Sequence, residues 1–300
     1  MPDLNGVHAI VVTHQPDLPL LAIELQALEK QVDAIWIIDN GSSTCMQGWL
    51  NQCQFSESLH LISMPENTGI GAAQNQGIVQ AISHGASHIL LMDQDTIPVA
   101  GMVEALLMHG QRIPRLGAIA SKYIDERRSD RSKLLHLEAP TSVNQAEAHP
   151  VSHLIASGCL IPVSTLNAVG LMREDLFIDY VDTEWCLRAT RQGYVHYQID
   201  AVYMRHELGG MPLKLGSRTI ASHSPTRHYY QYRNAVALYR DPAIPFVWKL
   251  KDGWRMGLKF LFLMIAARPR WSHFKMMCTG LWHGLRKVGG KYPATAPSSQ

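Results

Sequence analysis

Residues 88–99 read HILLMDQDTIPV, an apolar run that stops abruptly at two aspartates separated by one residue. The run from Ile89 to Met92 is typical of a buried strand, and Asp93 and Asp95 follow it almost directly. Two carboxylates this close repel each other unless solvent or a cation compensates them. The stretch therefore predicts a strand that ends in either a solvated turn or a cation site.

Three further apolar segments resemble this strand, and helix-like segments separate them. The strands are expected in HAIVVTH (8–14), DAIWIIDNGSS (33–43) and LHLISMPENTG (59–69), and the helices in 20–31 and 70–85. Apolar strands separated by helices predict an α/β protein whose mostly parallel sheet is covered on both faces. The polar residues that end the strands, from Thr13 to Asp95, are then expected to gather at one edge, where such folds bind ligands.

The second half of the chain is less regular. Residues 119–150 are charged and loosely patterned, and we expect loops or a hairpin there. A strand and a helix are expected in 152–170, a helix from about Thr183, and a strand that ends at His206. Helical, aromatic and basic sequence follows from Tyr229.

The formal net charge of +2 conceals an asymmetry along the 300 residues. Residues 228–300 hold 12 Lys and Arg but two acidic residues, whereas residues 1–227 hold 15 basic and 23 acidic residues. We therefore expect a catalytic domain in 1–227 and a basic helical extension in 228–300. A basic extension favours an anionic partner, either a membrane surface or nucleic acid, and the acidic first domain argues against nucleic acid.

The five cysteines form no CxxC pair, which favours reduced thiols and a cytoplasmic location. The first residues show no basic leader, so they do not resemble a signal peptide. The longest apolar run of the extension, 260–267, is far shorter than the roughly 20 residues that span a bilayer. A cytoplasmic protein, peripheral on the cytoplasmic face of the membrane at most, is expected.

The Asp93–Gln94–Asp95 triplet has two interpretations. With Gln94 pointing away, two hard carboxylate ligands can share Mg²⁺ or Mn²⁺, which completes its shell with water and substrate phosphates. A solvated turn before the next helix is the alternative. The preceding strand favours the metal site, because it fixes the pair at the ligand-binding edge.

NTGIGAAQNQG, residues 67–77, also has two interpretations. Gln74 replaces the third glycine of a dinucleotide fingerprint, and no Lys-Ser/Thr pair makes a P-loop. A glycine-rich helix start offers free N–H groups to an anion, and Asn67, Gln74 and Asn75 add amides. A plain helix start with small packing residues is the alternative.

Three other residues are ambiguous when taken alone. Asp39 accepts hydrogen bonds from a base or ribose, or closes its own turn. Asp182 is a helix N-cap or a general base, and His206 is an ordinary residue at the end of a strand or a metal ligand.

The order of these motifs, VVTHQP, IDNGSS, ENTGIGAAQNQG, LLMDQD, FIDYVDTEWCLRA and VYMRHELG, resembles glycosyltransferase family 2. The closer likeness, over about residues 7–240, is to its bacterial rhamnosyltransferases. The resemblance implies a GT-A fold, a Rossmann-like nucleotide-diphosphosugar transferase with a mostly parallel central sheet, here followed by a C-terminal helical extension. It also implies inversion at the anomeric carbon, Mg²⁺ or Mn²⁺ as cofactor, and a nucleotide-sugar donor, with dTDP-β-L-rhamnose favoured.

The resemblance also assigns roles to residues. Thr13 would line the nucleotide pocket, Asp39 would contact the base, and Asp182 would be the catalytic base, with Glu184 as its helper. Asp93, Asp95 and His206 would hold the metal. The other expected donor-binding residues are Asn67, Gly71, Gln74, Asn75, Asp93, Gln94 and Arg233. The chain departs from the family at Val181, where many relatives have an acid, and at His14-Gln15, where many have Tyr-Asn.

The extension allows several roles. Its apolar residues between Val247 and Ile265 follow helical spacing, with basic residues on much of the other side. Such a helix lies in a membrane interface, packs on the catalytic domain, or forms a homodimer. The helix of 227–240 closes over the donor with Arg233 near a phosphate, or is purely structural.

The leading hypothesis is a rhamnosyltransferase that acts on a glycan or lipid-linked acceptor. The alternatives are a transferase of the same family with another UDP- or dTDP-sugar and a non-catalytic sugar-nucleotide binder. A sugar nucleotidyltransferase is disfavoured, because VVTHQPDLPL lacks a glycine-rich, basic loop.

Overall fold

The structure, a computed structural model, describes residues 6–53, 55–125, 148–206, 213–215, 218–220 and 223–293. Contacts divide the chain into two compact units. Unit 1 comprises residues 1–172 and 182–208, and unit 2 comprises residues 173–181 and 209–300. The sequence placed residues 173–181 in the first domain, whereas their contacts assign them to the unit of C-terminal helices.

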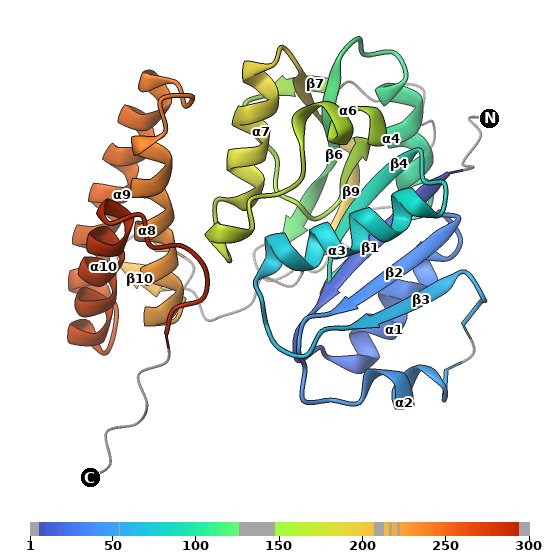
Figure 1. Ribbon diagram of the computed structural model, residues 1–300, viewed down its shortest axis with the longest axis horizontal. Helices are drawn as coiled ribbons and strands as arrows, with labels where there is room; N and C mark the ends of the chain where they lie inside the picture. The colour runs from blue at the N-terminus through green and yellow to red at the C-terminus, as the bar shows by residue number, and fades with distance from the viewer. Residues whose placement is uncertain are drawn as a thin grey trace. The chain divides into compact units, whose positions relative to one another are not determined.

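Unit 1 is built on a mixed sheet whose described strands lie in the order β3-β2-β1-β4-β8-β6-β9-β5, with β7 paired to β9 (Figure 1). The strands are β1 (Val7–Thr13), β2 (Ala34–Asp39), β3 (Leu59–Ser63), β4 (His88–Asp93), β5 (Thr96–Pro98), β6 (Leu116–Asp125), β7 (Ala148–Val151), β8 (Cys159–Pro162) and β9 (Val195–His206). β3, β2, β1 and β4 are parallel, as are β6 and β9, and β8 lies antiparallel between β4 and β6. The expected mostly parallel α/β architecture is confirmed.

Helices cover both faces of this sheet, as the apolar strands predicted. Ala9 and Val11 face the helices α1 (Leu18–Leu28) and α4 (Met102–Gly110). Ile10 points to the opposite face, toward α3 (Ile70–Ser83), because side chains alternate along a strand. A Cβ at Gly77 would lie 2.5 Å from Cγ2 of Ile10, so only glycine allows α3 this close to the sheet.

Two boundaries differ from the sequence-based expectation. Residues 119–125, where loops or a hairpin were expected, belong to β6, an internal strand of the sheet, and residues 126–147 lie outside the described part of the chain. The buried apolar segment of this strand, Ala118–Ala120, is only three residues long, and two of them are alanines. Because charged residues follow it, the sequence pattern did not indicate a strand. The helix α7 spans Val181–Arg191 and so begins two residues before Thr183. The remaining helices of this unit are α2 (Met46–Leu50) and α6 (Val163–Val169).

Unit 2 consists of helices that pack on one another (Figure 1). Its elements are a 3₁₀ turn (Glu174–Leu176), the hairpin β10 (Leu213–Leu215) and β11 (Arg218–Ile220), and the helices α8 (Pro225–Arg240), α9 (Phe246–Ala266) and α10 (Arg270–Leu285). The Ser224 side chain accepts a hydrogen bond from the Arg227 N–H and caps α8, with Pro225 in its first turn. α10 crosses α8 closely, because a Cβ at Gly280 would lie 2.4 Å from the Tyr229 carbonyl oxygen.

No helix among the described residues combines the length and the hydropathy that a membrane-spanning segment needs.

Candidate active site

The carboxyl ends of four parallel strands meet at one edge of the sheet. The register pairs Thr13 with Asp39, Asp39 with Ser63, and Val12 with Asp93. The polar residues that end these strands therefore gather at one edge, as expected from their positions in the sequence.

The turn that carries Asp93 and Asp95 is fixed from inside the protein by Ser157, which is almost fully buried. The Ser157 hydroxyl accepts a hydrogen bond from the Asp93 N–H at 3.1 Å and donates to the Thr96 hydroxyl at 3.0 Å. Nothing in the sequence near Ser157 signals this role. The two aspartate side chains are half-buried at the mouth of the turn.

The main chain of His206 lies next to this turn. β5 pairs antiparallel with β9, and its register places Thr96 opposite His206. Thr96, the residue after Asp95, and His206 are thus neighbours in the sheet although they are 110 residues apart in the sequence. The His206 side chain lies outside the described part of the structure, so its role as a metal ligand stays a prediction.

A third carboxyl group, that of Glu24 on α1, lies under the turn. Glu24 is 0% exposed, and neither of its carboxylate oxygens has a hydrogen-bond partner among the described residues. Burial raises the pKa of Glu24 well above its usual value, and the charges of Asp93 and Asp95 raise it further, weakly opposed by the nearby Thr96 N–H. A raised pKa favours the protonated, uncharged form of Glu24, so the negative charge at this turn comes from Asp93 and Asp95.

The donor set at this turn fits a divalent cation in part. Asp93 and Asp95 supply the hard oxygen ligands that Mg²⁺ and Mn²⁺ prefer. No cluster of three His, Cys, Asp or Glu side chains able to hold a metal occurs within the described ranges. The remaining ligands would have to come from water, from substrate phosphates, or from residues outside those ranges.

Side-chain amides tie the loops at this edge into a chain. Gln94 accepts a hydrogen bond from the His14 N–H at 2.7 Å and donates to the His14 carbonyl at 3.2 Å. Nδ1 of the His14 ring in turn lies 3.1 Å from the Asn40 carbonyl oxygen. The Asn40 side chain accepts from the Thr68 N–H at 2.9 Å and donates to the Gly69 carbonyl at 3.3 Å. Four loops are thereby linked, and the sequence had assigned no role to Asn40 or His14 in this link.

Asp39 is turned toward its own loop. Its Oδ1 accepts from the Thr13 hydroxyl at 3.4 Å and from the Ser42 N–H at 3.3 Å, and the Ser42 hydroxyl also bonds to it. Thr13 is fully buried and Asp39 nearly so. The turn-closing interpretation thus describes one carboxylate oxygen of Asp39, and its contact with a base stays a prediction.

The glycine-rich stretch forms the entry to α3. Gly69 has a φ of 96°, a conformation that favours glycine, and its N–H donates to the Asn67 side chain at 3.0 Å. Gly71 and Gln74 are buried in the first turns of the helix. The Asn75 amide instead bonds both main-chain groups of Met172, each at 2.9 Å. Asn75 thus holds Met172 in place, and its contact with a bound donor stays a prediction.

Asp182 lies in the first turn of α7, where its Oδ1 accepts from the Thr183 N–H at 2.7 Å. Because the helix already begins at Val181, the N-cap interpretation of Asp182 is wrong. Burial raises the pKa of the Cys159 thiol well above its usual value, and the charges of Cys186 and Asp182 add to that effect. The Asp182 carboxylate thus lies near Cys159, which pairs with Leu91 of β4, two residues before Asp93.

Glu184, the expected helper of Asp182, is paired with an arginine on the same helix. Its carboxylate is bound by both sides of the Arg188 guanidinium, at 3.0 and 3.1 Å. Arg188 also donates to the carbonyls of Val169 and Leu171, at 2.6 and 2.7 Å. The pair therefore holds the chain after α6 against α7, and the helper role of Glu184 stays a prediction.

The segment before Asp182 is strained and clamped within unit 2. Phe177, Asp179 and Tyr180 have positive φ angles of 63°, 62° and 66°. Such conformations cost about 1 kcal/mol or more each in residues other than glycine, so the surroundings must impose them. The Asn234 amide does so by donating to three carbonyls, those of Leu176 (2.9 Å), Ile178 (2.8 Å) and Asp179 (2.9 Å).

Arg233 belongs to the same clamp. It is 2% exposed, and its guanidinium donates to the carbonyls of Asp175 at 3.1 Å, Leu176 at 2.7 Å and Gly290. These contacts favour the purely structural interpretation of this helix, and the donor-binding role of Arg233 stays a prediction.

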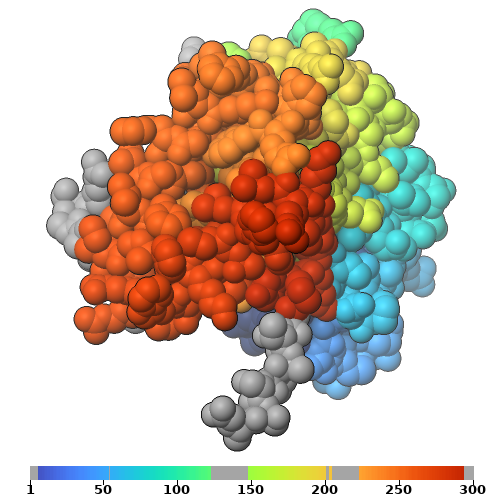
Figure 2. Space-filling view, turned by 60° about the vertical axis from the view of Figure 1, so that its left-hand side comes forward, coloured from blue at the N-terminus to red at the C-terminus, as the bar shows by residue number. Residues whose placement is uncertain are grey.

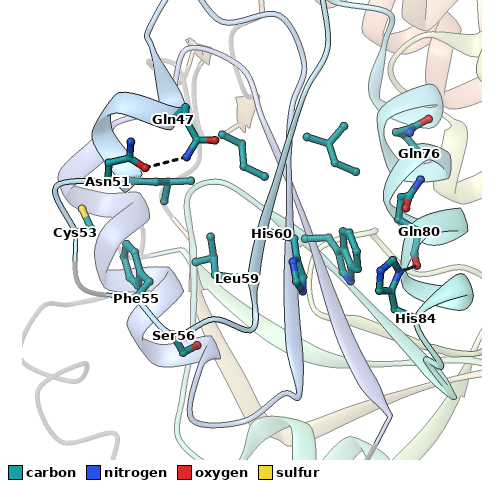
Figure 3. A pocket seen from close by; sticks show the side chains of 14 residues that line it. Gln47, Asn51, Cys53, Phe55, Ser56, Leu59, His60, Gln76, Gln80 and His84 are labelled. Carbon is teal, nitrogen blue, oxygen red and sulfur yellow. Dashed lines mark hydrogen bonds between the residues drawn. The ribbon is translucent and has the colours of Figure 1, made fainter.

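A separate hollow of about 710 Å³ runs along the edge strand β3, between α2 and α3 (Figure 3). Gln76, Gln80 and His84 line it from α3, while Gln47 and Asn51, hydrogen-bonded at 2.9 Å, line it from α2. None of the site residues expected from the sequence lines this hollow.

Comparisons with known proteins identify the family and the fold of the chain. Residues 9–168 match the family described as Glycosyl transferase family 2. The dTDP-rhamnosyl transferase RfbF of Shigella flexneri is 28% identical over 300 residues, which cover 97% of this chain and 99% of that protein.

Two solved structures are similar in fold. GalNAc-T7 with UDP, GalNAc and Mn²⁺ superposes with a TM-score of 0.57 at 10% identity, over 96% of this chain and 57% of that one. The chain thus spans little more than half the length of GalNAc-T7. The mannosyltransferase PcManGT of Pyrobaculum calidifontis, in complex with GDP-Man and Mn²⁺, has a TM-score of 0.57 at 16% identity, over 95% and 77%. These likenesses show the GT-A fold.

Proposed function

The chain belongs to glycosyltransferase family 2, and on this basis we propose that it is an inverting, metal-dependent rhamnosyltransferase that uses dTDP-β-L-rhamnose. The observation that carries the proposal is its similarity to a dTDP-rhamnosyl transferase, which extends over 97% of this chain and 99% of that protein. That similarity includes both units, not only the part that matches the family.

The donor is proposed to bind at the carboxyl ends of β1 to β4. Asp93 and Asp95, with His206, would hold Mg²⁺ or Mn²⁺ beside the donor diphosphate, and the mannosyltransferase and GalNAc-T7 structures both contain Mn²⁺. A cation held by these residues would supply the positive charge that stabilises the leaving diphosphate. Thr13 and Asp39 would line the nucleotide, with Asn67, Gly71, Gln74 and Gln94 along the same edge.

Asp182 is proposed as the general base. Its carboxylate takes the proton from an acceptor hydroxyl, and that oxygen attacks the anomeric carbon from the face opposite the diphosphate. The bond from the anomeric carbon to the phosphate oxygen breaks, and its electron pair leaves with the nucleotide diphosphate. One displacement inverts the configuration, so a β-L-rhamnosyl donor yields an α-L-rhamnoside.

The acceptor is proposed to be a glycan or a lipid-linked glycan, as in the assembly of cell-surface polysaccharides. We place the reaction in the cytoplasm, and the support is that all five cysteines are free thiols. Attachment to the cytoplasmic face of the membrane through the basic extension is part of the proposal, and a homodimer formed by the extension is the alternative.

The test is a panel of nucleotide sugars, measured by calorimetric binding and by donor hydrolysis, with Mg²⁺, Mn²⁺ or EDTA. dTDP-rhamnose is expected to bind at least tenfold more tightly than UDP-glucose, UDP-galactose or GDP-mannose, and only with a divalent cation. Tighter binding of a UDP-sugar would overturn the rhamnose assignment. Tight donor binding without hydrolysis or transfer to any glycan would favour a non-catalytic binder.

A further inference from the structure

The helix α9 is apolar on two opposite sides. Its inner side packs in unit 2, where Leu263 is buried with Tyr232 of α8 and Met277 of α10. Its outer side carries apolar residues spaced three or four apart, none of which is buried. These residues, here called the outer face, are Val247, Leu250, Trp254, Leu258, Leu261 and Ile265.

The exposure of the outer face is large. Leu250, Trp254 and Leu261 are 65%, 70% and 62% exposed, and Trp271 at the start of α10 is 79% exposed. Figure 2 shows α9 and α10, in orange to red, at the surface of unit 2. Contiguous apolar surface of this kind on a folded protein marks a binding surface.

The charge around the outer face has one sign. Lys251 and Arg255 are exposed beside it, and the exposed Arg268 and Arg270 follow the end of the helix. The single acidic residue of α9, Asp252, is buried and accepts hydrogen bonds from the hydroxyls of Tyr180 at 2.8 Å and Tyr239 at 2.6 Å. The exposed side of α9 therefore presents apolar and cationic groups without an acid.

This charge pattern discriminates between occupants. In a two-fold dimer the same patch meets itself, so the lysine and arginine side chains would face surfaces that hold no acid to pair with them. A bilayer with anionic headgroups accepts both components, because the acyl region buries the apolar face while lysine and arginine extend toward phosphates. We propose that the outer face of α9 binds an anionic phospholipid bilayer, with the helix lying in the plane of the interface. This binding does not depend on the transferase assignment.

Flotation of the full chain with lipid vesicles tests the proposal. Vesicles of phosphatidylcholine with 30% phosphatidylglycerol are expected to float at least ten times more protein than vesicles of phosphatidylcholine alone, at about 0.1 M salt. Raising the salt to 1 M is expected to reduce the bound fraction several-fold, since screening weakens the contacts with headgroups.

Two double variants separate the apolar and basic contributions. Trp254→Gln/Leu261→Gln is expected to lower binding at least tenfold, and Lys251→Glu/Arg255→Glu is expected to abolish the preference for phosphatidylglycerol. These positions are exposed, so we expect both variants to fold. An unchanged melting temperature of each variant checks this.

Two control variants make the same kinds of substitution at exposed positions outside α9. Ile23→Gln/Val79→Gln removes two other exposed apolar side chains, and Lys30→Glu/Arg112→Glu makes the same change in net charge. Both controls are expected to float like the unmodified chain. Equal flotation of the Trp254→Gln/Leu261→Gln variant, or no flotation with any vesicle, would overturn the proposal. So would a dimer in sedimentation velocity that this variant dissociates without any change in vesicle binding.

Discussion

The side chain of Gln94 is hydrogen-bonded to both main-chain polar groups of His14, 80 residues earlier in the chain. This pair connects the turn that carries Asp93 and Asp95 to the loop after β1. It is the first link of the chain of bonds that continues through Asn40 to the entry of α3. A side chain between two proposed metal ligands thus shapes the neighbouring loop.

Replacing Gln94 tests whether this link organises the donor site. Gln94→Met keeps the size of the side chain but removes both hydrogen bonds, at a cost of about 1–3 kcal/mol in unfolding free energy. We expect the dissociation constant of the donor to rise about tenfold, measured by calorimetry with Mg²⁺. Gln26→Met on the exposed side of α1 is the control, and an unchanged donor affinity in Gln94→Met would contradict the role.

Asp182→Asn tests the general base. The change removes the proton acceptor and leaves the shape of the first turn of α7, so transfer is expected to fall by about 10²–10⁴-fold while donor binding changes less than twofold. Asp200→Asn, on an exposed part of β9, is the matched control. Turnover of Asp182→Asn near that of the unmodified enzyme would remove the assignment.

Asn234→Ala tests the clamp on the segment before Asp182. Loss of three bonds to the carbonyls of residues 176, 178 and 179 is expected to lower the unfolding free energy by roughly 2–4 kcal/mol. Since Asp182 follows this segment directly, we expect kcat to fall about tenfold with donor affinity unchanged. Asn167→Ala, at an exposed position of α6, controls for the loss of an asparagine in a helix. A stable Asn234→Ala variant with normal kcat would show that the clamp does not position the base.

Glu184→Gln distinguishes a structural carboxylate from a catalytic one. The substitution breaks the paired contacts with Arg188 and is expected to cost about 1–3 kcal/mol in chemical unfolding. Transfer measured well below the melting temperature is expected to stay within about threefold of normal. Glu57→Gln at an exposed position is the control, and a hundredfold loss of transfer with intact folding would support Glu184 as a helper.

The histidine pair between α8 and α10 predicts acid sensitivity. His228 and His273 are buried, with their Nδ1 atoms 2.8 Å apart. Burial lowers the pKa of His228 to about 3, and the charges of Lys259 and His273 add to the effect. In the unfolded chain His228 is protonated as the pH falls through its usual pKa of 6.5. In the folded chain it is protonated only near pH 3.

Stability is therefore fully present above pH 6.5 and is lost as the pH falls from 6.5 toward 3. The slope for His228 alone approaches about 1.4 kcal/mol per pH unit. His228→Gln is expected to remove this part of the slope in urea unfolding curves between pH 7 and pH 4.5, whereas the exposed His153→Gln leaves it in place. Parallel pH profiles for the chain and its His228→Gln variant would refute the prediction.

The sequence predicted the elements of unit 1 well where a local pattern carried them. Apolar runs such as 89–92 are buried on both sides of a sheet, and polar residues end them, so the parallel sheet and its binding edge follow from periodicity. The strand β6 was missed, because small residues followed by charges give a weak local signal. The approach of β9 to the aspartate turn needed the register of β5, which no local pattern encodes.

The contacts that a side chain makes were harder to predict from the sequence than the element on which it lies. Arg233 and Asn75 were expected to contact the donor, yet they bond main-chain groups 57 and 97 residues away, at Leu176 and Met172. The direction of a polar side chain depends on which distant backbone groups lack partners, and that is settled only when the elements pack.

The sequence by itself determined the alternation of strands and helices up to β4, the position of Asp93 and Asp95 at the end of a buried strand, and the basic character of the extension. These follow from side chains close together in the chain. Only the tertiary structure decided that Gln94 holds His14, that residues 173–181 belong with the helices, and which apolar side of α9 stays exposed. Either apolar side of such a helix could be buried. Which side is buried depends on how well its side chains fit the surfaces of the neighbouring helices.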